Sequence, residues 1–297
     1  MPWFVGERTP HRLGTGRGLE TERDGREDRH DELLQRATEA VRSRILALAP
    51  PETRDEVQRA AQGTSAIYFA YPVQDGLLDA TAAMALAARE AGISRLVNLV
   101  MLQSSIDAPT PRMRQNYLSE QVFEWAGIGA VHIRATVFYE NLGSQVRQSL
   151  PAQGAVRLPW GRETTVLPLV SAEDVARVAV GLLTSPSLPA NAAYPLIGSV
   201  ISLKDIIATF GRVLARNVRY EETTDEEWRS DAITRGYNEH ALAHLSALWK
   251  ALRAASLDPE RARFAVTDTI EKIGGARPKT FEQFVREGLS EPLAKSA

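Results

Sequence analysis

The tyrosines are the first candidates for chemistry, because hydride transfer to a carbonyl favours a general acid beside the developing alkoxide. A common arrangement is Tyr-x-x-x-Lys, in which the lysine lowers the tyrosine pKa and both side chains lie on one helix face. Tyr117 stands in a helical pattern, but Gln121 occupies the lysine position, and the other tyrosines also fail the spacing. The sequence therefore predicts no such pair. Tyr117 and Tyr139 are the catalytic candidates, with Asn116 as a further polar group.

Two histidines have a spacing that suits zinc. His240 and His244 stand four residues apart in a helical pattern, which places them on one face. Ala241 to Ala243 supply no glutamate base, and no third ligand is evident, so we interpret these histidines as part of a surface face and predict no metal site. The chain has no cysteine and no G-x-S-x-G motif. These absences exclude a thiol nucleophile, a thiolate metal site and a nucleophile elbow.

The glycines of Gly14-Thr-Gly16-Arg-Gly18 suggest a phosphate-binding turn. Such a turn follows a buried strand and opens a helix, so that backbone N–H groups and the helix dipole meet the pyrophosphate. Here no apolar strand precedes the glycines, their spacing is not G-x-G-x-x-G, and residues 20–32 after them are mostly charged. We therefore favour a flexible loop over a phosphate loop and expect little order in residues 6–31.

The elements that would position these groups become regular from Ser65 onward. Apolar runs alternate with helical patterns at the spacing of βαβ units, which predicts right-handed crossovers and a parallel sheet. The predicted strands are 65–71, 95–101 and 130–133, and the predicted helices are 52–62, 77–91 and 112–126. Gly129–Asn141 enters the sheet as a buried strand and leaves it at the carboxyl edge, where open α/β sheets bind ligands.

The second half of the chain mixes strands and helices. Residues 164–170 predict a strand that ends at the helix N-cap Ser171, with Asp174 in capping-box spacing. Further on, the sequence predicts a helix that begins at Ser202, a short strand at 218–220 and a last helix that ends near residue 285. We expect a smaller lobe built from residues 141–168 and from residue 185 onward.

The tryptophans are most simply explained by packing. We expect Trp125, Trp160, Trp228 and Trp249 in the core or in the lobe. Trp228 and Trp249 belong to the predicted lobe, so they are also candidates to line a substrate pocket.

Composition bounds the class of protein. The 297 residues carry 35 basic and 37 acidic side chains, so no basic surface predicts binding to nucleic acid. The N-terminal stretch has no apolar core of signal-peptide length, and no apolar run approaches a membrane span. We expect a globular cytoplasmic protein that binds a small molecule, with neither nucleic acid nor membrane as a partner. The sequence does not indicate an oligomeric state.

From about Glu52 to its end, the chain resembles the NmrA-like branch of the atypical short-chain dehydrogenase/reductases. The segments that carry the resemblance occur in the family's order, which makes the set specific. They are Ser65–Pro72, Ala91–Val97, Glu120, Trp125–Ile128, Ile133–Asn141, Pro168–Ala176, Ala193–Gly198 and Gly275–Phe281.

The resemblance implies a Rossmann-like parallel sheet flanked by helices, a small C-terminal α/β lobe, and NADP or NAD along the carboxyl ends of the strands. The implied domains are an atypical, poorly ordered segment 1–44, an NAD(P)-binding domain 45–184 with part of 141–168 in the lobe, and a substrate lobe 185–297. The implied cofactor-binding positions are Ala70, Tyr71, Pro72, Val100, Met101, Asn116, Ala135, Thr136, Val137 and Phe138. Tyr139 and Asn141 point toward the lobe junction and join Trp228 and Trp249 as substrate candidates.

The chain departs from the family pattern at several positions. Residues 1–44 match neither the first strand nor the G-x-x-G-x-x-G turn, Val100-Met101 replaces a frequent Ser-Ser, Asn116 replaces a lysine and Ala135 a proline. Without the glycine turn, affinity for a dinucleotide should fall sharply. Either the true N-terminus is missing or replaced, which we favour, or cofactor binding is lost. We expect the sheet to begin with residues 45–49, beside the strand 65–71.

Two functions follow from the resemblance, because the family includes reductases of quinones and related acceptors as well as nucleotide-sensing regulators. The first is an NAD(P)H-dependent oxidoreductase of a small carbonyl or quinone-type compound, in which orientation of donor and acceptor carries most of the effect. The second is a non-catalytic sensor of nucleotide or ligand. The lobe helices favour the enzyme, whereas the absent Tyr/Lys pair and the altered N-terminus favour the sensor.

Overall fold

The computed structural model describes residues 54–187, 189–257 and 264–288, which all belong to one compact unit, Leu46–Ala297. The predictions for residues 6–31, Gly14–Gly18 and the strand 45–49 lie outside the described residues. No described helix combines the length and the apolar character needed to cross a membrane.

The main sheet has four parallel strands in the order β1-β2-β3-β7. They are β1 (Ile67–Phe69), β2 (Leu96–Met101), β3 (Ala130–Ala135) and β7 (Ala193–Leu196). The predicted parallel sheet is confirmed, and β1 is shorter than the predicted strand 65–71. β7 lies in the region assigned to the smaller lobe but pairs with β3 in this sheet. Its Pro195 is tolerated because, among the described strands, β7 pairs with β3 alone, so the missing N–H breaks no central ladder.

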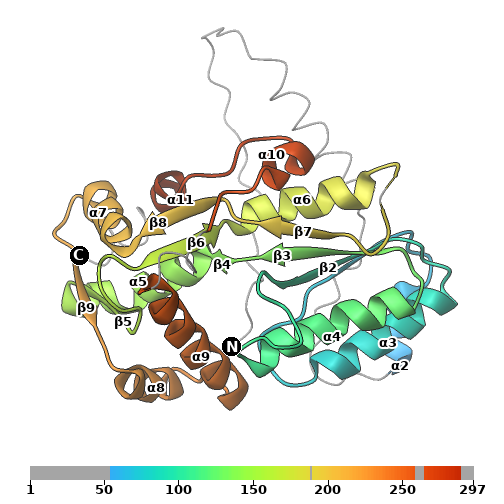
Figure 1. The fold of residues 1–297 in the computed structure, drawn as a ribbon, viewed down its shortest axis with the longest axis horizontal. Coiled ribbons are helices and arrows are strands. Elements are labelled where there is room, and N and C mark those ends of the chain that lie inside the picture. Colours follow the sequence, from blue (N-terminus) through green and yellow to red (C-terminus); the bar gives the residue numbers. More distant parts are fainter. Residues whose placement is uncertain (1–53, 188, 258–263, 289–297) are drawn as a thin grey trace, which may run out of the picture. The chain divides into compact units, whose positions relative to one another are not determined.

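Helices cover both faces of this sheet (Figure 1). One set is α2 (Arg54–Ala61), α3 (Leu77–Glu90) and α4 (Pro111–Trp125), and the other is α6 (Ala172–Thr184) with α10 (Thr269–Gly274). Each set buries its own apolar cluster against the strands. Gly129 precedes β3 with a φ of +64°, and a Cβ there would lie 2.1 Å from Ser94 O. The turn into β3 therefore requires glycine.

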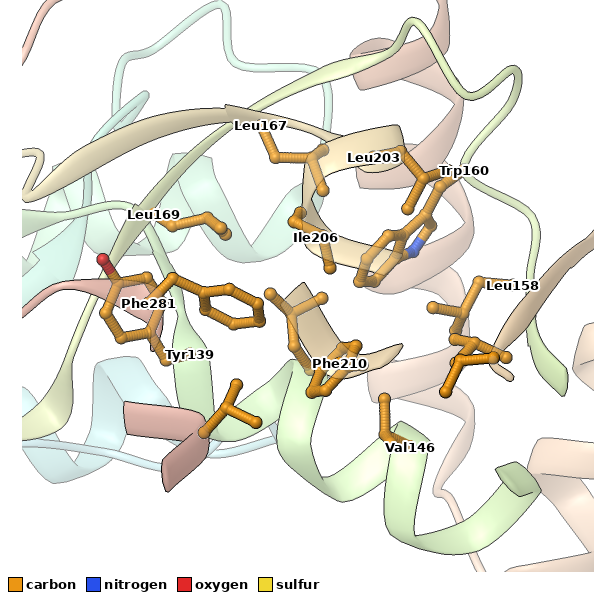
Figure 2. Packing of buried hydrophobic residues seen from close by; sticks show 14 of the residues in the cluster. Tyr139, Val146, Leu158, Trp160, Leu167, Leu169, Leu203, Ile206, Phe210 and Phe281 are labelled. Carbon is orange, nitrogen blue, oxygen red and sulfur yellow. The ribbon is translucent and has the colours of Figure 1, made fainter. Parts of the chain in front are cut away.

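The lobe carries two smaller sheets and five helices within the described residues. Its sheets are β4 (Val137–Phe138), β6 (Val166–Val170) and β8 (Ser199–Ser202), and β5 (Ala155–Leu158) with β9 (Arg219–Glu222). Its helices are α5 (Tyr139–Gln153), α7 (Leu203–Leu214), α8 (Asp225–Thr234), α9 (Glu239–Ser256) and α11 (Phe281–Gly288). All of these elements except α8 contribute to the aromatic core of Figure 2, where the ring of Phe281 lies 5.3 Å from those of both Tyr139 and Phe210, whereas α8 packs in a separate cluster with Leu242 of α9. Each large apolar side chain buried here contributes about 1.5–3 kcal/mol.

The helix caps follow the sequence closely. Ser171 Oγ accepts from the Asp174 N–H and Ser202 Oγ accepts from the Asp205 N–H, as predicted. The Asp174 carboxylate, in contrast, accepts from Arg177 and from the Lys279 N–H. Asp174 therefore binds the C-terminal segment instead of completing the predicted capping box, because these partners outcompete the backbone N–H of the N-cap residue.

Candidate functional site

The carboxyl ends of β1, β2 and β3 meet at one edge of the main sheet, and the chain crosses from there to the second sheet. Ala135 ends β3, and Val137–Phe138 pairs with β6. Between them, Thr136 donates from its N–H to Leu196 O at 3.3 Å and from its hydroxyl to Pro168 O at 2.8 Å. The turn that joins sheet and lobe is therefore held by backbone carbonyls of β7 and β6.

The implied cofactor positions lie along this edge because the strands are parallel and in register. They differ in how much surface they offer. Ala70 and Pro72 are exposed, Tyr71, Met101, Thr136, Val137 and Phe138 are half-buried, and Val100, Asn116 and Ala135 are buried. The structure thus brings the predicted positions together, with an accessible surface at the ends of β1 and β2 and in the turn after β3.

Helix α4 is fastened to β3 next to this turn. Glu120 lies in the second half of α4, and its carboxylate accepts from Arg134 Nε at 2.8 Å and Nη2 at 2.6 Å. Charge-assisted bidentate pairs of this kind fix orientation as well as distance. Glu120 and Arg134 therefore hold the end of β3, and with it Ala135–Phe138, against α4.

Tyr139 is buried in the lobe core. It is 0% exposed, its ring contacts Phe281 and Phe284, and burial raises its pKa to about 12. Its hydroxyl shares a hydrogen bond with Ser199 Oγ at 2.9 Å and donates to Lys279 O at 3.1 Å. Tyr139 therefore joins the first turn of α5 to the C-terminal segment. Asn141, two residues on, is half-buried.

The tryptophans are placed only partly as expected. Trp228 and Trp249 are buried in the lobe, where Trp249 packs on Trp160 at 5.0 Å between ring centres and Trp228 meets Tyr237. Trp125 is 75% exposed, so its predicted place in the core is wrong. It is the last residue of α4, and its side chain leaves the face that packs on the sheet.

Two further candidates lie side by side on α4. Tyr117 is half-buried, and Asn116 is 2% exposed. Among the described residues the Asn116 Oδ1 atom has no hydrogen-bond partner, which is unusual for a buried polar atom. Asn116 therefore offers an amide oxygen near the carboxyl edge that no described residue binds.

Arg112 is a site residue that the sequence did not single out. Its Nη2 donates to Tyr71 O at 2.6 Å and its Nη1 to Gln74 O at 3.4 Å, while its guanidinium carbon lies 5.6 Å from the centre of the Tyr71 ring. Burial lowers the pKa of Arg112 to about 10. The signal was its spacing, because Arg112 precedes Asn116 by four residues and so occupies the same face of α4.

The two histidines of α9 face this part of the molecule rather than solvent. His244 is 2% exposed, and its Nδ1 lies 2.9 Å from Thr110 Oγ1, the N-cap of α4. Burial, with Arg112 and His240 nearby, lowers the His244 pKa to about 3. His240 Nδ1 lies 3.0 Å from Asp75 Oδ1. The expectation of a surface face is therefore wrong, since α9 packs against the start of α4.

Comparison with known proteins gives a consistent picture. The NmrA-like family matches residues 27–284. The NAD(P)H azoreductase of Xenophilus azovorans is 25% identical over 225 residues, which cover 75% of each chain. The fold is similar to that of Citrobacter sp. triphenylmethane reductase complexed with NADP(H), with a TM-score of 0.66, 17% identity, and 80% of this chain and 81% of that chain covered. It is also similar to NmrA, a negative transcriptional regulator, in complex with NADP, with a TM-score of 0.63, 17% identity, and 82% and 80% covered.

Proposed function

Because the chain belongs to the NmrA-like family, we propose that it is an NAD(P)H-dependent oxidoreductase of a small carbonyl or quinone-type compound. The observation that carries the proposal is the carboxyl edge itself. Exposed Ala70 and Pro72, the half-buried turn Thr136–Phe138 and Asn116, whose Oδ1 atom has no partner among the described residues, lie along one edge between sheet and lobe. Parallel α/β sheets bind their ligands at such edges.

The residues at this edge suit the nicotinamide half of a dinucleotide. Small Ala70 and Ala135 allow close approach of a planar ring, and Asn116 offers an amide for the polar groups of a ribose or carboxamide. A reduced nicotinamide supplies a hydride, and the proton that completes reduction of the acceptor comes from water. With Tyr139 buried in the core, the contribution of the protein is mainly to orient donor and acceptor and to limit access of water.

The test is a fluorescence titration of the full chain with NADPH and with NADH, followed by oxidation of the bound cofactor with menadione. We expect saturable binding in the micromolar range and consumption of menadione. Ala70→Trp fills the edge and should weaken binding at least about tenfold, since a 1.4 kcal/mol change in free energy corresponds to that factor. The matched control is Ala82→Trp on the exposed side of α3, which should bind as the parent does.

Two outcomes would contradict the proposal. A folded parent chain that binds neither cofactor rules out the dinucleotide assignment. Equal weakening by Ala70→Trp and Ala82→Trp would show that the carboxyl edge is not the binding surface.

One observation favours a second function, that of a non-catalytic nucleotide or ligand sensor. Gln121 stands where the lysine of a Tyr-x-x-x-Lys pair with Tyr117 would stand, and Tyr139 is buried in the lobe core. Micromolar binding without oxidation of NADPH by any quinone or carbonyl in a panel would support this alternative.

A further inference from the structure

Arg112 is a buried cation without a buried anion. The residue is 2% exposed, and among the described residues no carboxylate forms an ion pair with it. A guanidinium carries five N–H donors, of which the carbonyl oxygens of Tyr71 and Gln74 accept two. The Nε atom is buried and has no partner. Burying a charge in this way is costly unless a counter-charge or further hydrogen bonds offset the lost hydration.

Other unpaired polar atoms gather on the same elements. On α4, the buried Gln115 Oε1 and Asn116 Oδ1 atoms lack partners, and on α9 the buried His240 Nε2 atom also lacks one. Asn and Gln amides can present either oxygen or nitrogen by rotation, so both can donate. Buried polar atoms that lack a partner among the described residues are the ones that a ligand would contact.

The helix geometry adds to the same preference. Arg112 lies in the first turn of α4, behind the N-cap Thr110, where the helix dipole favours negative charge. The 3.4 Å bond from Nη1 to Gln74 O is long, so a better acceptor can replace that carbonyl. Tyr71 and Gln74 belong to the loop after β1, at the carboxyl edge.

We propose that Arg112, with the amide of Asn116, binds an oxyanion, a carboxylate or phosphate carried by the acceptor substrate or by the cofactor. The first source would make anionic acceptors the preferred substrates, and the second would make Arg112 a cofactor-selecting residue. The assignment of these two sources rests on the proposed reductase function. The presence of an oxyanion site does not.

The first experiment therefore needs no turnover. Thermal unfolding of the parent chain is followed in increasing inorganic phosphate, with sodium chloride at matched ionic strength as the reference. We expect Tm to rise with phosphate beyond the chloride series, as for a ligand that binds only the folded state. Arg112→Met should abolish this rise. Arg114→Met is the matched control, because Arg114 also donates to a backbone carbonyl, that of Ala108, from the same helix, and its variant should keep the rise.

The second experiment separates the two sources. The parent, Arg112→Met, Arg112→Lys and Arg114→Met are compared with NADPH and NADH, and with menadione and the anionic 1,4-naphthoquinone-2-sulfonate as acceptors. If the anion belongs to the substrate, Arg112→Met raises KM for the sulfonate about 10- to 100-fold while KM for menadione changes little, as expected for a lost charge-assisted bond. If the anion belongs to the cofactor, Arg112→Met raises the Kd for NADPH, and the effect is the same whichever acceptor is used. Arg112→Lys keeps the charge and should lie between parent and Arg112→Met.

The outcomes keep the two proposals apart. A parent that shows the phosphate effect but reduces no acceptor contradicts the reductase function and leaves the oxyanion site standing. No phosphate effect in a folded parent, or an equal effect in parent and Arg112→Met, overturns the oxyanion site. If Arg112→Met does not fold, Arg112→Lys carries both tests, because it retains charge but not the planar donor set.

Discussion

Arg177 and Arg112 are both buried, at 8% and 2% exposure, and both hold backbone carbonyls of a distant segment. Arg177 donates to Gly274 O and Arg277 O, and Arg112 donates to Tyr71 O and Gln74 O. Only Arg177 has a carboxylate partner, the fully buried Asp174. The same side chain thus appears once with its charge compensated and once without.

The difference separates a structural arginine from an available one. The Asp174 carboxylate compensates the charge of Arg177 and also accepts from the Lys279 N–H, so this group fastens the C-terminal segment to α6 with its charge balanced, although Arg177 Nε has no hydrogen-bond partner among the described residues. Arg112 fastens the loop after β1 but keeps an unpaired positive charge beside further unpaired polar atoms. In the first arrangement the charge is balanced within the protein, which we call closed, and in the second the charge is open to a ligand.

The largest effect is expected when Arg177 is left, like Arg112, without a counter-charge. Asp174→Ala leaves Arg177 buried without a counter-charge and should lower the free energy of unfolding by about 3–5 kcal/mol. Urea denaturation measures the change. The control Asp205→Ala removes an aspartate at a capped N-terminus that is exposed, and should cost about 1 kcal/mol or less. A loss below about 1 kcal/mol for Asp174→Ala would remove the distinction between the two arginines.

The next effect is a loss of stability at acid pH, because the region of Arg112 should not accept a second buried positive charge. The folded-state pKa of His244 is lowered from 6.5 to about 3. As pH falls below 6.5 the unfolded chain takes up a proton that the folded chain does not, so stability present at neutral pH is lost at up to about 1.4 kcal/mol per pH unit. Urea midpoints between pH 7 and pH 4 should fall less steeply in His244→Gln than in the parent.

The matched control for this pH dependence is Ala243→Gln, which alters the exposed neighbour on α9 and should keep the parent slope. Identical slopes in the parent and His244→Gln would show that His244 is not kept neutral by the fold.

A smaller effect on stability is expected at Arg112. Arg112→Met leaves two carbonyl oxygens without a donor but also removes a buried charge, so the free energy of unfolding should fall by about 1–3 kcal/mol. Arg177→Met is the comparison, since it leaves the Asp174 carboxylate unpaired and should cost more, about 3–5 kcal/mol. Equal losses in urea denaturation would mean that both arginines have the same structural role.

The smallest effect is expected for the contact between α9 and the loop after β1. Asp75 is exposed and lies 3.0 Å from His240 Nδ1, so Asp75→Asn should cost about 0.2–1 kcal/mol, less at high salt. Thermal unfolding at low and at high sodium chloride measures this difference. A larger loss that persists in high salt would show that the pair is shielded from solvent and belongs to the closed type of arrangement.

Much of the fold was accessible from local patterns. The apolar runs at 95–101 and 130–133 predicted parallel strands, and Ser171 and Ser202 predicted helix starts, because burial and capping act over a few residues. The place of β7 was not accessible, since four residues containing a proline carry little strand signal and gain their role from β3. The prediction for Trp125 was wrong for a related reason, because the sequence does not say which side of a helix end meets the sheet.

For the candidate site, too, one part was predictable from local patterns and another part was not. That Gly129–Asn141 ends at the carboxyl edge of the sheet follows from the alternation of strand and helix along the chain. The burial of Tyr139 depends on Lys279, which lies 140 residues away, and no local pattern reports such a contact.

The sequence by itself determined the parallel α/β core, the location of its carboxyl edge and the lack of a Tyr-x-x-x-Lys pair, since strand burial, helix capping and residue identity are local properties. Only the tertiary structure decided which polar groups are compensated. Asp174 and Arg177 share one helix turn, whereas Arg112 meets Tyr71 across 41 residues and Thr110 meets His244 across 134. The cost of a buried charge depends on everything packed around it, and that environment exists only once the distant segments have come together.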